Sequence, residues 1–267
     1  MKVRVPALIL VVLILGLAVQ AMAQAPARLS DKQVKQLITD TRDAVSRFVD
    51  KMDPQMRTAV LKGEGYTIDI KASLKEMDEL GKQAANAFNP PSNAGTEVTA
   101  YLKKLKAVDK GLSQRAGMSG ADKYWEDAKP AFGRLAAAYR IDWAGDPTAW
   151  SAKRVSDGEV TTAAADIKKQ AGTLGKAVDS ALKTDKSVTQ AARAGIVTQV
   201  KGIETAADDF GKEFKNGRDA LPALGRLSGA VDKVATAVPA AALAGPAATA
   251  LDSIKTRLSL LNMAFGK

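Results

Sequence analysis

Apolar residues recur at intervals of three and four along most of this chain. Such spacing places them in a stripe on one face of an α-helix. We therefore predict eight helices, whose stripes span about 31–52, 70–88, 98–112, 125–139, 167–182, 196–214, 221–238 and 251–265. Sustained two-residue alternation is absent, so no strand is expected. The predicted fold class is all-α.

Glycine and proline separate these stripes. The segments 62–65, 89–92 and 117–120 are expected to end or interrupt helices, because proline cannot continue the hydrogen-bond ladder and glycine weakens it. Pro130 falls inside the fourth stripe, where it should kink the helix or mark its true start.

The two halves of the chain resemble each other. The segment from Leu29 to Val34 aligns with the segment from Val155 to Val160, an offset of 126 residues. Each segment has the pattern of a capping box, in which Ser30 or Ser156 opens a helix. At the other end of each half, Trp125 and Leu251 begin matching apolar series with the same offset. We predict an internal duplication that gives two tandem antiparallel four-helix units.

This repeat defines the expected domain organisation. The first helical unit is placed at 24–139, a non-periodic connector at 140–154 and the second helical unit at 155–267. Residues 1–23 have a basic start, an apolar run and the small residues Ala21 and Ala23 before Gln24, which is the layout of a secretory signal peptide. The apolar run is about 15 residues, shorter than the roughly 20 that span a bilayer, so an uncleaved anchor is the less favoured alternative.

The composition excludes several kinds of chemistry. The chain has no cysteine and no histidine, which rules out disulfides, haem attachment through Cys-x-x-Cys-His, serine–histidine–aspartate triads and the usual zinc sites. In size and helix number the chain is similar to cytochrome c′-like bundles, but their haem-attachment motif is missing and no residue role carries over. We predict no enzyme activity, no catalytic residue and no cofactor.

Carboxylates are the remaining candidates for a metal site. Asp78, Glu79, Asp208 and Asp209 occupy corresponding places in the two halves, and Asp109 corresponds to Asp232. Oxygen ligands suit a hard cation, but no calcium-loop spacing is present. Surface carboxylates paired with lysine are the favoured interpretation, and no metal site is predicted.

The formal net charge is +10. In the cytoplasm this charge would suggest nucleic acid as a partner. Export to the periplasm or the cell exterior makes nucleic acid unlikely and leaves anionic envelope components or another protein. A basic helix can lie on an anionic membrane surface. However, lysines are interleaved with acidic residues here, so ordinary solvated faces are favoured.

The tryptophans cluster around the connector. Trp125, Trp143 and Trp150 lie close together in sequence, with Tyr124 beside the first of them. Exposed aromatic rings there would contact a partner or a sugar. Alternatively, the rings would wedge the two units together, and we favour this second interpretation.

We therefore expect an exported, non-enzymatic helical protein that binds or scaffolds another molecule. Two alternatives stay open: a helical protein that binds lipid at the membrane surface, and a carboxylate-based metal protein or enzyme.

Overall fold

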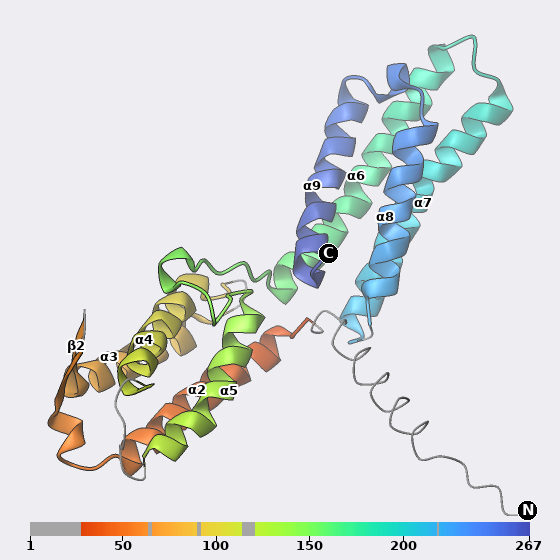
Figure 1. The fold of residues 1–267 in the computed structure, drawn as a ribbon. Helices are drawn as coiled ribbons and strands as arrows, with labels where there is room; N and C mark the ends of the chain where they lie inside the picture. The colour runs from red at the N-terminus through yellow and green to blue at the C-terminus, as the bar shows by residue number, and fades with distance from the viewer. Residues whose placement is uncertain (1–27, 64–65, 90–91, 114–120, 218) are drawn as a thin grey trace, which may run out of the picture.

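The computed structural model describes residues 28–63, 66–89, 92–113, 121–217 and 219–267. Within these ranges the chain forms eight α-helices, three short 3-10 helices and one two-stranded sheet (Figure 1). The chain is therefore mostly helical, as the apolar periodicity predicts. The predicted signal peptide, residues 1–23, and the break at 117–120 lie outside the described residues.

The helices form two groups, which we call the N-terminal and C-terminal bundles. The N-terminal bundle contains α2 (Asp31–Lys51), α3 (Ile70–Ala87), α4 (Gly95–Ser113) and α5 (Asp122–Ala138). The C-terminal bundle contains α6 (Asp157–Thr184), α7 (Gln190–Lys215), α8 (Leu221–Ala237) and α9 (Pro246–Phe265). The 3-10 helices are η1 (Met56–Thr58), η2 (Pro147–Ala149) and η3 (Ala240–Leu243). All eight predicted helices are present.

The helices begin and end where local chemistry directs them. Ser30 and Ser156 both make the predicted capping boxes, with Gln33 and Glu159 as the reciprocal partners. α9 ends at Phe265 and is capped by Gly266, whose left-handed φ of 78° suits glycine. Pro130 does not mark a helix start, because α5 begins at Asp122 and runs through it.

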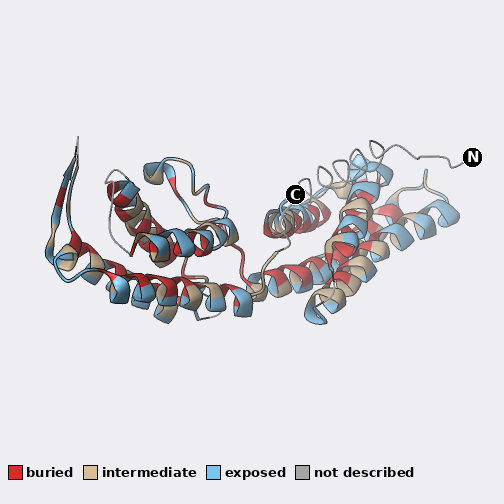
Figure 2. Cartoon of the chain, turned by 60° about the horizontal axis from the view of Figure 1, so that its bottom comes forward, coloured by how far each residue is buried: buried red, intermediate tan, exposed pale blue. Residues whose placement is uncertain are grey.

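The two bundles have separate hydrophobic cores. In the N-terminal bundle, α2 packs against α5 and α3 against α4, around buried rings that include Phe48 and Phe132. In the C-terminal bundle, α6 packs against α7 and α9, and α7 packs against α8. Figure 2 shows the buried positions along the inward faces of the helices. Burying each large apolar side chain contributes about 1.5–3 kcal/mol, which supports a core in each bundle.

A short β-hairpin interrupts the N-terminal bundle, and here the expectation of no strands is wrong. Strands β1 (Val60–Gly63) and β2 (Tyr66–Asp69) pair antiparallel, with Leu61 opposite Ile68. Leu61 is buried in the N-terminal core. Each strand has only four residues, too few for a two-residue alternation to stand out from the surrounding helical pattern.

The bundles lie end to end (Figure 1). α2 and α6 both begin at the meeting point and run away from it in opposite directions. The chain end at α9 also lies at this meeting point. The junction is therefore built from two helix N-termini and the end of the last helix.

Candidate functional site

The first residues of α2 and α6 bond to each other. The backbone N–H of Asp31 donates to Oδ2 of Asp157 at 2.9 Å, and the backbone N–H of Asp157 donates to Oδ2 of Asp31 at 3.0 Å. The first N–H groups of a helix have no partner within the helix, and its N-terminus favours negative charge. Each helix therefore supplies the carboxylate that the other helix's N-terminus needs.

Two arginines complete this arrangement in the same reciprocal way. Arg28 donates to the Asp157 carboxylate at 2.5 Å and to the carbonyl of Val155 at 2.9 Å. Arg154 donates to the Asp31 carboxylate and, at 3.4 Å, to the carbonyl of Leu29. We call Arg28, Asp31, Arg154 and Asp157 the junction cluster. Each arginine thus bridges the two helix starts.

The arginines also lie over aromatic rings of both bundles. The guanidinium carbon of Arg28 lies 5.1 Å from the ring centroid of Phe214, and that of Arg154 lies 5.9 Å from the ring centroid of Phe88. Phe88 and Phe214 are 126 positions apart, as are Arg28 and Arg154. Cations at this distance from an aromatic face are attracted to it. The same offset therefore relates the ion pairs, the backbone bonds and the ring contacts.

One of the two ion pairs is much less exposed than the other. The side chains of Arg154 and Asp31 are 3% and 11% exposed, whereas those of Arg28 and Asp157 are 9% and 34% exposed. Burial raises the pKa of Asp31 above its ordinary value, although Arg154 opposes this change. Burial likewise lowers the pKa of Arg154. The Arg154–Asp31 pair is therefore held in a poorly hydrated setting, where losing either partner is costly.

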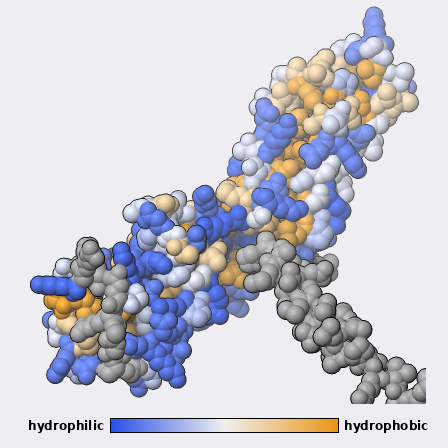
Figure 3. All heavy atoms as spheres, viewed as in Figure 1, coloured by the Kyte–Doolittle hydropathy of each residue, from blue (hydrophilic) through white to orange (hydrophobic). Residues whose placement is uncertain are grey.

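Beside the junction cluster lies a cavity of about 740 Å³, which we call the junction pocket. Both bundles contribute to its lining, which consists of Arg28, Leu29, Gln33, Leu37, Asp40, Arg134, Ala137, Ala138, Arg140, Arg154, Val155, Ala264, Phe265 and Gly266. Figure 3 shows hydrophobic residues gathered where the bundles meet, bordered by hydrophilic ones. Concave sites of 300–1,000 Å³ with apolar walls and a few polar groups are typical of small-molecule binding.

Four arginines line the junction pocket, but only two of them are paired. Arg134 and Arg140 are exposed, and their guanidinium groups form no hydrogen bond or ion pair within the described part of the chain. The one carboxylate in the lining belongs to Asp40, which accepts from the amide of Gln36 at 2.9 Å. The pocket wall therefore carries unneutralised positive charge.

Arg140 adopts a backbone conformation that usually belongs to glycine. It has a φ of 56° and follows the end of α5. The N–H of Arg140 bonds to the carbonyl of Ala137, and the N–H of Ile141 bonds to the carbonyl of Ala136. This is the Schellman pattern, in which the left-handed residue is most often glycine. The left-handed region costs a non-glycine residue roughly 1–2 kcal/mol, so an arginine is held here at a local cost.

The aromatic residues singled out from the sequence lie in or against the N-terminal core. Trp125 and Trp150 are buried, and Tyr124 and Trp143 are half-buried against the same core. The rings form a continuous run in which successive centroids from Phe48 are 4.8, 5.1, 5.8 and 5.5 Å apart, through Trp125, Phe132, Trp143 and Trp150. They pack on one bundle, so the structure does not place them as a wedge between the two. A partner contact at these residues stays a prediction.

Trp125 and Trp150 differ in their polar contacts. The indole N–H of Trp125 donates to Asp109 at 2.8 Å, and Asp109 also pairs with Lys129 at 3.1 Å. The indole N–H of Trp150 is buried without a partner in the described structure. A second cavity, of about 530 Å³, lies beside Trp150 at the start of α4. Its lining includes Lys103 but no carboxylate among the described residues.

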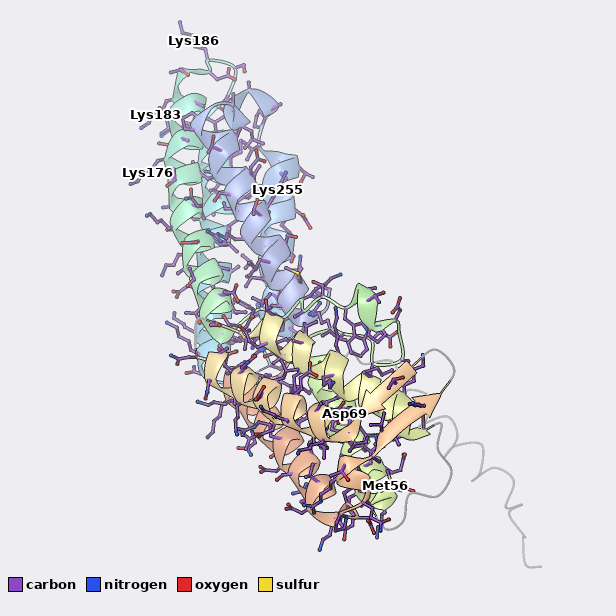
Figure 4. The ribbon with its side chains drawn as sticks, turned by 90° about the vertical axis from the view of Figure 1, so that its left-hand side faces the viewer. Met56, Asp69, Lys176, Lys183, Lys186 and Lys255 are labelled. Atoms are coloured by element: carbon purple, nitrogen blue, oxygen red, sulfur yellow. The ribbon has the colours of Figure 1, made fainter. Side chains whose placement is uncertain are left out.

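Four of the six candidate cation ligands pair with lysine, as expected for surface carboxylates, whereas Asp209 and Asp232 form no ion pair among the described residues. Asp78 pairs with Lys82 at 2.6 Å, and Asp208 pairs with Lys168 and Lys212 at 2.7 and 2.5 Å. No group of three or more acidic residues that could hold a metal ion occurs in the part of the chain described here. Other lysines are simply solvated: Figure 4 shows Lys176, Lys186 and Lys255 projecting from the outside of the C-terminal bundle.

The described helices include none that is both long enough and apolar enough to cross a membrane. Comparisons with protein-family models, with curated proteins and with solved structures found no match to this chain. The junction pocket was not predicted from the sequence. Two sequence features do mark its arginines: Arg28 and Arg154 come just before the capping boxes, and Arg140 comes just after the fourth apolar stripe.

Proposed function

We propose that this chain is an exported, non-enzymatic protein that binds a small molecule in the junction pocket. The observation that carries the proposal is the cavity of about 740 Å³ to which both bundles contribute. Its size and its mixture of apolar and polar lining fit a small-molecule site. Export follows from the signal-peptide pattern of residues 1–23.

The proposed site has apolar wall from both bundles. Leu29 and Leu37 contribute apolar wall from the segment just before α2 and from α2 itself, and Phe265 contributes it from the end of α9. Phe265 is only partly buried against the C-terminal core, so part of its surface is free to contact a ligand. Burying that surface would contribute about 25 cal/mol per Å².

We also infer that the two bundles arose by duplication of one four-helix unit. The reciprocal contacts of the junction cluster support this, because every pair of corresponding residues is 126 positions apart. Both bundles also pack their first helix against their last and their second against their third. Exchanging the corresponding residues, Leu29→Val with Val155→Leu, should leave the unfolding free energy within about 0.5 kcal/mol of the parent. A much larger loss would count against equivalence of the two positions.

The binding proposal is tested with N-phenylnaphthylamine, an uncharged dye that fluoresces in apolar surroundings. We expect one saturable site per chain. The variant Ala137→Trp should abolish it, because Ala137 is exposed and lines the pocket, so the indole can fill the cavity without entering the core. The matched control is Ala235→Trp, at an exposed position in α8.

Dye fluorescence that does not saturate, or that is equal in the two tryptophan variants, would refute the proposal. Circular dichroism shows whether both variants keep the parent helix content, so a loss of binding is not confused with a loss of folding.

A further inference from the structure

We propose that the ligand of the junction pocket is an anionic amphiphile, an apolar body that carries one carboxylate, sulfonate or phosphate group. This inference rests on the proposed function, since it names the chemical class of the molecule bound there. It follows from the charge of the wall, the state of each charged group and the apolar surface beside them.

The charge of the pocket wall selects for an anion. Four guanidinium groups and one carboxylate line the cavity in the described structure. Arg28 and Arg154 are committed to Asp157 and Asp31. The positive charge available to a ligand therefore comes from Arg134 and Arg140, whose guanidiniums have no partner in the described residues.

These two arginines can meet one anionic group together. Arg134 lies in α5 four residues before its last residue, and Arg140 lies two residues after that end, so they are six positions apart, and both line the same cavity. A guanidinium is a planar fork of N–H donors that matches carboxylate, sulfonate and phosphate oxygens. Asp40 is the carboxylate that could compete for them, but no ion pair joins it to either arginine.

The backbone conformation of Arg140 indicates that this arginine has a role other than stabilising the fold. Its φ of 56° would be less strained with glycine. A cation after a helix C-terminus is favoured by the helix dipole, but this effect is small at an exposed site. An arginine that lines a pocket at a strained backbone position is therefore better accounted for by a bound anion.

The apolar wall distinguishes an amphiphile from a free inorganic ion. Leu37, Ala138 and Phe265 line the same cavity as the free arginines. Sulfate or phosphate alone would gain nothing from these side chains. A molecule with a chain or ring attached to its anionic group would contact both parts of the wall.

The test compares two dyes that differ only in a sulfonate group, N-phenylnaphthylamine and anilinonaphthalenesulfonate. We expect the folded parent protein to bind the sulfonate about ten- to a hundredfold more tightly at low salt. In the double variant Arg134→Gln/Arg140→Gln, the two dyes should bind with affinities within about threefold of each other. The control Arg47→Gln, an exposed and unpaired arginine of α2 sixteen residues beyond Asp31, should keep the parent's preference.

The outcomes separate this inference from the function on which it rests. Equal binding of the two dyes by the parent overturns the anionic preference but leaves the binding site standing. Failure of both dyes overturns the site itself. Displacement of the sulfonate dye by sodium sulfate as effectively as by dodecanoate would show that the apolar wall is unused and would overturn the amphiphile.

An anionic group attached to an apolar body occurs both in free molecules with one acyl chain and in membrane lipids. We expect dodecanoate to displace the dye in the parent protein and phosphatidylglycerol vesicles to leave it bound, because the pocket is a cavity of small-molecule size. Displacement by the vesicles but not by dodecanoate would overturn the free ligand in favour of a lipid surface.

Discussion

Asp31 and Asp157 each accept the backbone N–H of the other, so the first turns of α2 and α6 complete one another. The contact is self-complementary, as in the interface of a symmetric dimer, although both partners belong to one chain. Each helix therefore depends for its N-terminal bonding on a residue that belongs to the other bundle. This relationship makes the junction an ordered part of the protein and gives the junction pocket a defined wall.

The two ion pairs of the junction cluster should contribute unequally to stability. Arg154→Met leaves Asp31, whose side chain is 11% exposed, without its cation, and should lower the unfolding free energy by about 3 kcal/mol. Arg28→Met affects Asp157, whose side chain is 34% exposed, so solvent screening should limit the loss to about 1 kcal/mol. Urea unfolding followed by circular dichroism measures both.

The control for this comparison is Lys82→Met, which breaks an ion pair to Asp78 in which both side chains are 56% exposed. It should change the unfolding free energy by no more than about 0.5 kcal/mol. Equal effects of Arg154→Met and Arg28→Met would contradict the unequal burial on which the prediction depends.

Arg140→Gly should stabilise the fold while weakening the binding of anions. Glycine relieves the left-handed strain, and part of that gain is offset by the greater freedom of glycine in the unfolded chain. The net increase in the unfolding free energy should be about 0.5–1 kcal/mol. The melting temperature and the affinity for anilinonaphthalenesulfonate should therefore move in opposite directions. A destabilised variant would show that the arginine is kept for the fold.

Thr41→Val should also stabilise the protein. Thr41 is fully buried in α2, and its hydroxyl has no hydrogen-bond partner in the described structure. Valine has nearly the same shape and removes the unpaired hydroxyl, so the unfolding free energy should rise by about 1 kcal/mol. Thr161→Val is the matched control, because the Thr161 hydroxyl donates to the carbonyl of Asp157 at 2.9 Å, and this variant should show no gain.

The carboxylate of Asp208 should titrate at unusually low pH. Hydrogen bonds from Lys168 and Lys212 lower its pKa from 3.8 to about 2. Because this pKa is lower in the folded state, the stabilisation is fully present above about pH 4 and is lost as the pH falls towards 2. Carboxyl carbon chemical shifts followed by NMR measure the midpoint. Lys168→Gln should raise it towards the ordinary value, and an unchanged midpoint would mean that this lysine is not the partner in solution.

The helices could be predicted from the sequence, because each bundle buries one stripe of each helix. The capping boxes at Ser30 and Ser156 fixed two helix starts to the residue. The β-hairpin could not be predicted from periodicity, but Gly63, Gly65 and the β-favouring residues of β2 carried a weak signal for it.

The junction pocket could not be predicted from the sequence, and the reason is geometric. Arg134 and Phe265 are far apart along the chain, and they line one cavity only because α2 and α6 start at the same point. Asp31 and Asp157 are 126 positions apart, but nothing in this spacing specifies that the two helices meet N-terminus to N-terminus. The expectation that the connector tryptophans wedge the two units together did not allow for local packing. Apolar rings in a non-periodic segment can pack back onto the nearer core, as Trp150 does.

The run of rings from Phe48 to Trp150 gives this molecule an optical label in one half only. All three tryptophans belong to the N-terminal bundle or pack against it, and residues 155–267 contain neither tryptophan nor tyrosine. Intrinsic fluorescence therefore records the melting of the N-terminal half alone, whereas helix content records both halves. Coincident melting curves would show that the junction makes the two halves unfold as a single cooperative unit, and a separation between the curves would show how far that coupling falls short.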